Sequence, residues 1–175
     1  EILISVIYFF GRALVNNLAI LKLFIKHGFD ISQKYSIYDQ NLLMLACDDF
    51  RINMNKDAIE IITLLIDNGV DVNYQDKNGI TALMYLLEYG CIEDDDKIKE
   101  IIKLLYNRGV DLELRNNQGK SIIHYAVNID NYKLVEYLIE LGVKLEVFDL
   151  SNYYIKDLDL LNLLYENGFD LSILL

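Results

Sequence analysis

Two histidines and two cysteines are the residues of this chain most suited to nucleophilic or acid–base chemistry. A catalytic histidine needs a nucleophile on one side and an orienting carboxylate on the other. The sequence places no such partners around His124, so we predict a structural role for it. His27 stands directly before Gly28, where a donor suits the exposed carbonyl groups at a helix end. Cys47 and Cys91 match no metal-ligand spacing, and an apolar helical run surrounds Cys47, which predicts an inert buried thiol.

Two acidic segments have the composition of a cation site but not its order. A calcium loop alternates oxygen ligands, bends at a glycine and ends in a bidentate glutamate. The run Glu93-Asp94-Asp95-Asp96 lacks that order and suits the positive N-terminal end of the helix expected after it. The segment 71–76 has the spacing of a repeated hairpin instead. We therefore predict no catalytic residue, no metal ion and no cofactor, and the protein is not expected to be an enzyme.

The charge balance limits the kinds of partner. The chain of 175 residues has 16 Lys and Arg against 27 Asp and Glu, a net charge of −11. Such a chain is repelled by nucleic acid and by anionic membranes, and its lysines at 97, 99 and 103 alternate with acidic residues. The apolar run 2–10 is shorter than the ~20 residues that a membrane-spanning helix needs. We expect no nucleic-acid binding and no membrane insertion by this segment.

A short phrase recurs five times and predicts the elements that position these residues. It begins at Gly28, Gly69, Gly109, Gly142 and Gly168, with steps of 41, 40, 33 and 26 residues. Before each glycine, apolar residues recur at steps of three and four, which predicts an amphipathic helix ending at the glycine. A second, shorter helix is predicted after each of Asn41, Thr81 and Ser121, which are all favourable N-cap residues.

This unit resembles the ankyrin repeat, whose pattern Gly-x-Thr-Pro-Leu-His-x-Ala precedes two antiparallel helices and a hairpin loop. Residues 119–148 and 69–86 carry the resemblance most fully, although the chain contains no proline. The resemblance implies an all-α ankyrin-repeat solenoid in a single domain, residues 1–175. We expect about five units, near 1–35, 36–75, 76–115, 116–148 and 149–175. Two of them have enlarged inter-helix loops, around Asp48–Lys56 and Glu88–Lys97.

The resemblance also implies the function, which is to bind a partner protein through the concave face formed by hairpin tips and inner helices. Projected onto this chain, the contact residues are Tyr35, Tyr38, Gln75, Lys77, Asn78, Glu88, Tyr89, Arg115, Asn117, Gln118, Asn128 and Phe148. Asp48, Asp49 and Ile129 lie at the same helix ends. Aromatic residues and arginine dominate the energetics of protein interfaces, which supports this composition.

The apolar ends leave an alternative open. The runs 2–10 and 171–175 have the composition of interior seams, whereas the ends of a solenoid normally have polar faces. The chain is then a structural or regulatory segment of a longer protein, packed against a sibling domain, or one of its ends docks on another surface. In isolation we expect a monomer or weak end-to-end association.

Overall fold

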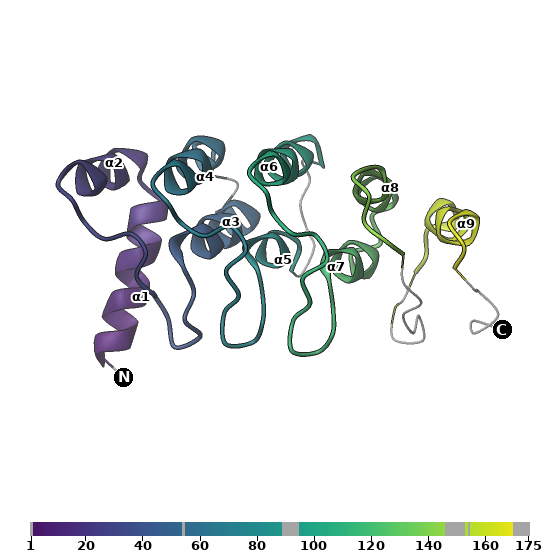
Figure 1. Ribbon diagram of the computed structural model, residues 1–175, viewed down its shortest axis with the longest axis horizontal. Coiled ribbons are helices and arrows are strands. Elements are labelled where there is room, and N and C mark those ends of the chain that lie inside the picture. Colours follow the sequence, from purple (N-terminus) through teal and green to yellow (C-terminus); the bar gives the residue numbers. More distant parts are fainter. Residues whose placement is uncertain (1, 54, 89–94, 146–152, 154, 170–175) are drawn as a thin grey trace.

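A computed structural model of the protein shows a row of helix pairs with hairpin loops along one side (Figure 1). It describes residues 2–53, 55–88, 95–145, 153 and 155–169, with the side chains of residues 2–8 excepted. Every regular element in the described part of the chain is helical. The all-α solenoid predicted from the repeats is confirmed.

The helices form two layers. The inner layer, nearer the hairpins, contains α1 (Ile2–Val15), α3 (Leu42–Asn53), α5 (Ala82–Leu87) and α7 (Ile122–Asn128). The outer layer contains α2 (Leu18–Lys26), α4 (Ala58–Asp67), α6 (Asp95–Asn107), α8 (Tyr132–Glu140) and α9 (Leu158–Glu166). Successive inner helices pack on one another. The outer helices α2, α4 and α8 pack against α1, α3 and α7, and both α6 and α9 pack against α8. One cluster of buried apolar side chains extends along the described chain from Leu14 to Phe169.

Each repeated glycine ends an outer helix as predicted. At the end of α4, Gly69 has a φ of 86°, which a residue with a side chain adopts only with strain. The N–H groups of Gly69 and Val70 donate to the carbonyls of Ile66 and Leu65 at 3.0 and 3.1 Å. This pattern satisfies carbonyls that the helix itself leaves free, and it recurs after the other outer helices.

The inner helices begin where the N-cap residues predict. The side-chain oxygens of Asn41 and Thr81 accept from the N–H groups of Met44 and Met84 at 2.9 and 3.3 Å. The sequence did not predict α1 as a helix. It crosses the end of the row steeply, whereas α3, α5 and α7 are seen nearly end-on (Figure 1).

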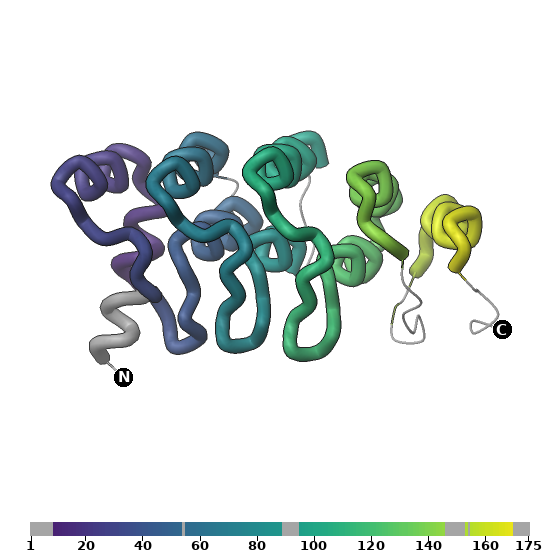
Figure 2. The backbone as a smooth tube through the Cα atoms, in the orientation of Figure 1, coloured from purple at the N-terminus to yellow at the C-terminus, as the bar shows by residue number. Residues whose placement is uncertain are grey.

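The first enlarged unit differs from the prediction. Residues 48–53 continue α3 instead of forming a loop, so that the insertion lengthens an inner helix. Residues 89–94 of the second enlargement lie outside the described residues, and Asp95 already belongs to α6. In the described part of the chain, three hairpins separate an outer helix from the next inner one: hairpin 1 (28–41), hairpin 2 (69–81) and hairpin 3 (109–121). They lie side by side in Figure 2.

Candidate functional site

Hairpin 2 is shaped by one carboxylate. Asp76 Oδ1 accepts hydrogen bonds from the backbone N–H groups of Asn78 and Ile80, both at 2.8 Å. Its other oxygen, Oδ2, accepts from the hydroxyl group of Tyr85 on α5 at 2.7 Å. Burial, and then this hydrogen bond, raises the pKa of the Tyr85 hydroxyl well above its ordinary value. The side chain of Asp76 therefore fixes the hairpin and joins it to the inner helix.

Hairpin 3 has the same shape with an amide in place of the carboxylate. Asn116 Oδ1 accepts from the N–H groups of Gln118 and Lys120 at 2.9 and 3.0 Å. Because Oδ1 is used in this way, Nδ2 faces Tyr125 and donates to its hydroxyl oxygen at 3.0 Å. The two hairpins thus share a geometry, while the direction of the bond to tyrosine is reversed.

The hairpins are bonded to one another near their tips. The backbone N–H of Lys77 donates to the carbonyl of Tyr38, and that of Asn117 donates to the carbonyl of Asn78, each at 2.9 Å. We call this pair of bonds the tip ladder. Gln75 adds a side-chain bond from hairpin 2 to the carbonyl of Arg115 at 2.8 Å. The ladder fixes the relative positions of the side chains on neighbouring hairpins.

A groove of about 490 Å³ opens between hairpins 2 and 3. We call it the amide groove, because half of its lining residues carry a carboxamide. It extends from the hairpin tips to the residues at the C-terminal ends of α5 and α7, Glu88 and Asn128. It is lined by Asn78, Ile80, Glu88, Asn116, Asn117, Gln118, Lys120, His124, Tyr125 and Asn128.

The polar side chains of the groove divide into anchored and available ones. Asn116 is buried and fully engaged, and Asn117 Nδ2 donates to the carbonyl of Lys77 at 2.9 Å. Asn78, Gln118 and Asn128 are exposed, and their side chains form no hydrogen bond with any residue that the structure describes. The groove therefore presents three side-chain amides on a framework that the other amides stiffen.

His124 lines the groove but supports the helix beneath it. The backbone N–H of Ser121 donates to His124 Nδ1 at 3.1 Å, which satisfies a free donor at the N-terminus of α7. Nδ1 is therefore an acceptor and carries no proton in this arrangement. The imidazole is buried and holds a capping position, in agreement with the structural role predicted for it.

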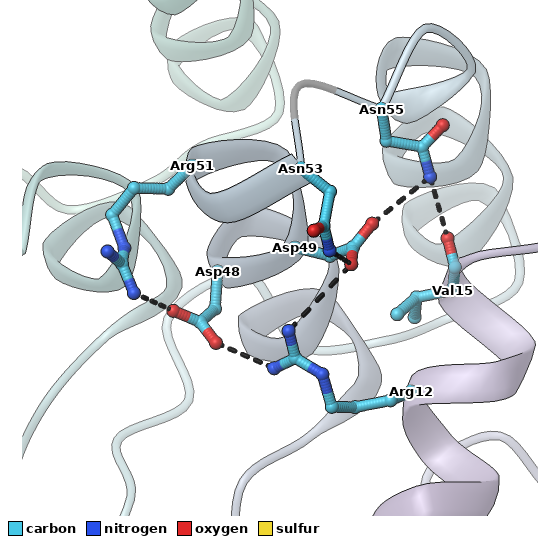
Figure 3. A network of polar contacts seen from close by, with 7 residues as sticks. All are labelled: Arg12, Val15, Asp48, Asp49, Arg51, Asn53 and Asn55. Carbon is cyan, nitrogen blue, oxygen red and sulfur yellow. Dashed lines mark hydrogen bonds and ion pairs between the residues drawn. The ribbon is translucent and has the colours of Figure 1, made fainter. Parts of the chain in front are cut away.

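Asp48 and Asp49 lie in an ionic network and not on a contact surface, so their prediction as contact residues was wrong. Arg12 of α1 donates to Asp48 at 2.7 Å, and Arg51 binds the same carboxylate (Figure 3). Asp49 accepts from the amides of Asn53 and Asn55 at 2.5 and 3.2 Å. The carboxylates face α1 because residues 48–53 continue α3 toward that helix.

The prediction that Tyr35 contacts a partner was also wrong. Its side chain is only 1% exposed and lies under α1, where it faces Gly11, so it cannot contact a partner at the hairpin tip. Its hydroxyl group forms no hydrogen bond with a described residue. Burial raises the pKa of Tyr35 to about 12.

The remaining predicted residues fall into three groups. The amide groove brings together five of them, Asn78, Glu88, Asn117, Gln118 and Asn128. Of four others, Gln75, Lys77 and Arg115 lie on the two hairpins that form the groove, and Tyr38 lies on hairpin 1. Two, Tyr89 and Phe148, lie outside the described residues.

Sequence reasoning missed several lining residues, above all Ile80, Lys120 and Tyr125. At the step of 40 residues Lys120 follows Ile80 and Tyr125 follows Tyr85, but neither earlier residue was predicted as a contact, so the repeat alone did not point to them. No cluster of three or more histidine, cysteine or acidic side chains suited to a metal occurs within the described ranges. Cys47 is buried and has no disulfide partner among the described residues, and burial raises the pKa of its thiol to about 12. Among the described helices, none is long and apolar enough to cross a bilayer.

Comparison with known proteins agrees with this architecture. A family model described as ankyrin repeats in three copies matches residues 43–149. A segment of 67 residues is 34% identical to the mouse (Mus musculus) protein named ankyrin repeat and SOCS box protein 6. That segment is 38% of this chain but only 15% of the mouse protein. Ankyrin repeats are generally protein–protein interaction modules. Since the family model covers more than half of the chain and the helix pairs and hairpins follow its pattern, the chain belongs to the ankyrin repeat family.

Proposed function

We propose that the protein binds a partner protein through the amide groove and the hairpin tips beside it, without catalysing a reaction. The observation that carries the proposal is the groove itself, about 490 Å³ in volume and lined from two successive hairpins. The tip ladder and Asp76 fix the backbone of these hairpins, so that binding orders little of the protein. A surface fixed in advance loses less conformational entropy when a partner binds.

A photo-crosslinking amino acid at position 118 tests this proposal. Gln118 is exposed in the groove, and Lys103 is exposed on outer helix α6, which makes it the control position. In extracts of the source organism, we expect a specific adduct from position 118 and none from position 103. Equal adducts from both positions, or adducts from position 103 alone, would count against the concave face.

A second candidate function has its own observation. At the first end of the row, Phe9 of α1 and Leu23 of α2 are 70% and 53% exposed. Below them, the rings of Phe10, Phe24 and Phe29 pack edge to face. This end is suited to pack against a sibling domain or a second copy. Light scattering at rising protein concentration should then detect weak association that the substitution Leu23→Ser removes.

A further inference from the structure

We infer that the amide groove binds an extended segment of the partner by its main chain, through the side-chain amides of Asn78, Gln118 and Asn128. The inference rests on the proposed function and names the form of ligand that the site takes. It starts from the chemical character of the lining, which contains five carboxamides and only two largely apolar side chains, Ile80 and Tyr125.

The composition of the lining differs from that of the sites used in the other common modes of peptide recognition. An amphipathic helix needs an apolar groove for its apolar face, and a polyproline segment needs a groove lined by several aromatic rings. Pockets for small apolar ligands are likewise lined mainly by hydrophobic side chains. The amide groove has no such lining, because only two of its ten lining residues, Ile80 and Tyr125, have a largely apolar side chain.

The available amides match the polar groups of a peptide backbone. Each carboxamide has an N–H donor and a carbonyl acceptor, as does each peptide unit of a partner chain. The side chains of Asn78, Gln118 and Asn128 are exposed and unbonded within the described part of the chain. Asn116 and Asn117 are less available to a partner, since one N–H of each Nδ2 already donates, to the hydroxyl oxygen of Tyr125 and to the carbonyl of Lys77.

The three amides come from three elements that hydrogen bonds hold together. Asn78 belongs to hairpin 2, Gln118 to hairpin 3, and Asn128 is the last residue of α7. The tip ladder joins the two hairpins at 2.9 Å, and Asn116 joins hairpin 3 to Tyr125 of α7. An extended segment has unpaired backbone groups along its length, whereas a helix pairs its own. A site that offers side-chain amides from three elements therefore suits an extended segment.

Charge adds a preference for basic segments. The chain has a net charge of −11, and Glu88 lines the groove at its helix end. The opposite charge in the groove, Lys120, has its Nζ 6.0 Å from the ring centroid of Tyr153, at cation–π distance. The net charge of the chain therefore attracts a positively charged segment during encounter, and salt weakens this attraction, while within the groove Lys120 balances Glu88.

A phage-displayed library of linear 12-residue peptides, selected on the whole protein, supplies the probe. The best peptide is synthesised with a fluorophore, and its affinity is measured by anisotropy. We expect the combined substitutions Asn78→Ala, Gln118→Ala and Asn128→Ala to weaken binding at least tenfold. Asn107→Ala, at an exposed amide on outer helix α6, is the control and should leave affinity unchanged. Because the three side chains are exposed, circular dichroism should show that the triple variant keeps its fold. Gln118→Glu is a second variant, which replaces the amide by a carboxylate of nearly the same shape.

The main-chain contact is tested on the peptide. Methylation of alternate backbone nitrogens should weaken binding at least tenfold in one register and little in the other, as alternate groups of an extended chain face opposite sides. If both registers bind like the unmodified peptide while the triple variant still loses affinity, main-chain recognition is wrong and the concave site remains. If the triple variant binds normally, or the library yields no peptide specific to this protein, the inference is overturned. The crosslinks from position 118 then decide the proposed function separately.

Discussion

The side-chain amide of Asn116 donates a hydrogen bond to the hydroxyl oxygen of Tyr125 at 3.0 Å. Forty residues earlier, the same bond runs in the opposite direction, from the Tyr85 hydroxyl to Asp76 at 2.7 Å. Both Asp76 and Asn116 use Oδ1 for two backbone N–H groups of their hairpin. The chain therefore contains two versions of one hairpin support, one charged and one neutral, and each predicts the effect of a substitution in the other.

Asp76→Asn should cost less than about 1 kcal/mol of unfolding free energy, because the new amide can copy Asn116. Oδ1 would keep both backbone bonds, and Nδ2 would donate to the hydroxyl oxygen of Tyr85. Asp76→Ala should cost about 3 kcal/mol, since three donors lose a buried acceptor. Urea unfolding measures both values, and a similar loss in the two variants would show that the charge of Asp76, and not its shape, supports the hairpin.

A comparison of two glycines with nearly equal φ angles distinguishes the cost of a strained backbone from the cost of a steric clash. Gly79 has a φ of 74° and Gly119 a φ of 76°. A Cβ atom at Gly79 would lie 2.9 Å from the backbone of Asn116 and Asn117, whereas one at Gly119 meets nothing within 4 Å. Alanine at either position should cost about 1–2 kcal/mol through the left-handed backbone. Gly79→Ala should cost at least about 1 kcal/mol more, because it also forces hairpins 2 and 3 apart.

Thermal and urea unfolding of the two alanine variants measure this difference. Peptide binding should weaken in Gly79→Ala but not in Gly119→Ala, since the amide groove lies between the hairpins that Gly79 brings together. Equal stability of the two variants would mean that the tip ladder tolerates separation and does not fix the groove.

The ionic network predicts a large effect for a cation that the sequence did not single out. Arg12→Ala should lower the unfolding free energy by roughly 3 kcal/mol, because it leaves the carboxylates of Asp48 and Asp49 poorly compensated in a largely buried place. Lys22→Ala is the matched control. Its ion pair with Glu60 is 2.5 Å long but about half exposed on both sides, so its loss should cost less than about 1 kcal/mol. Urea unfolding measures both variants, and equal losses of unfolding free energy would indicate that burial does not make the Arg12 network more stabilising than an exposed ion pair.

Much of the fold follows from local pattern, because each signal acts within a few residues. The glycine phrase, the apolar stripe before it and the caps at Asn41 and Thr81 all fix bonds inside one helix or at its end. The amide groove was partly predictable for the same reason. Asn78 and Gln118 occupy equivalent places in successive hairpins, so that a repeat projected onto itself brings both to one face.

The wrong predictions, Tyr35, Asp48 and Asp49 as contact residues, all concern side chains that contact α1. These contacts join residues far apart in the chain. Arg12 meets Asp48 across 36 residues, and Gly11 lies against Tyr35. Lys77 and Arg115, predicted as contact residues from their places at the hairpin tips, also donate side-chain bonds to the carbonyls of Ile37 and Gly119 at 3.0 and 2.8 Å. Changes at these two residues would disturb the hairpins as well as any binding. For this reason Asn78 and Gln118 are the cleaner probes of the groove.

Tyr35→Phe should leave the protein at least as stable as the wild type at neutral pH and more stable in alkali. The buried hydroxyl of Tyr35 bonds to no described residue, so its removal costs no hydrogen bond there. The ordinary tyrosine pKa is 10.0, and burial raises that of Tyr35 to about 12. Between these values the unfolded chain loses the proton while the folded protein keeps it, so stability falls as the pH rises from 10 toward 12.

Urea unfolding at pH 7 and pH 11 should therefore show a larger loss of unfolding free energy in the wild type than in Tyr35→Phe. Tyr38→Phe, at a side chain 48% exposed, should follow the wild type. Cys47 and Tyr85 titrate alike in all three proteins, so parallel losses would exclude Tyr35 as a source of alkaline instability.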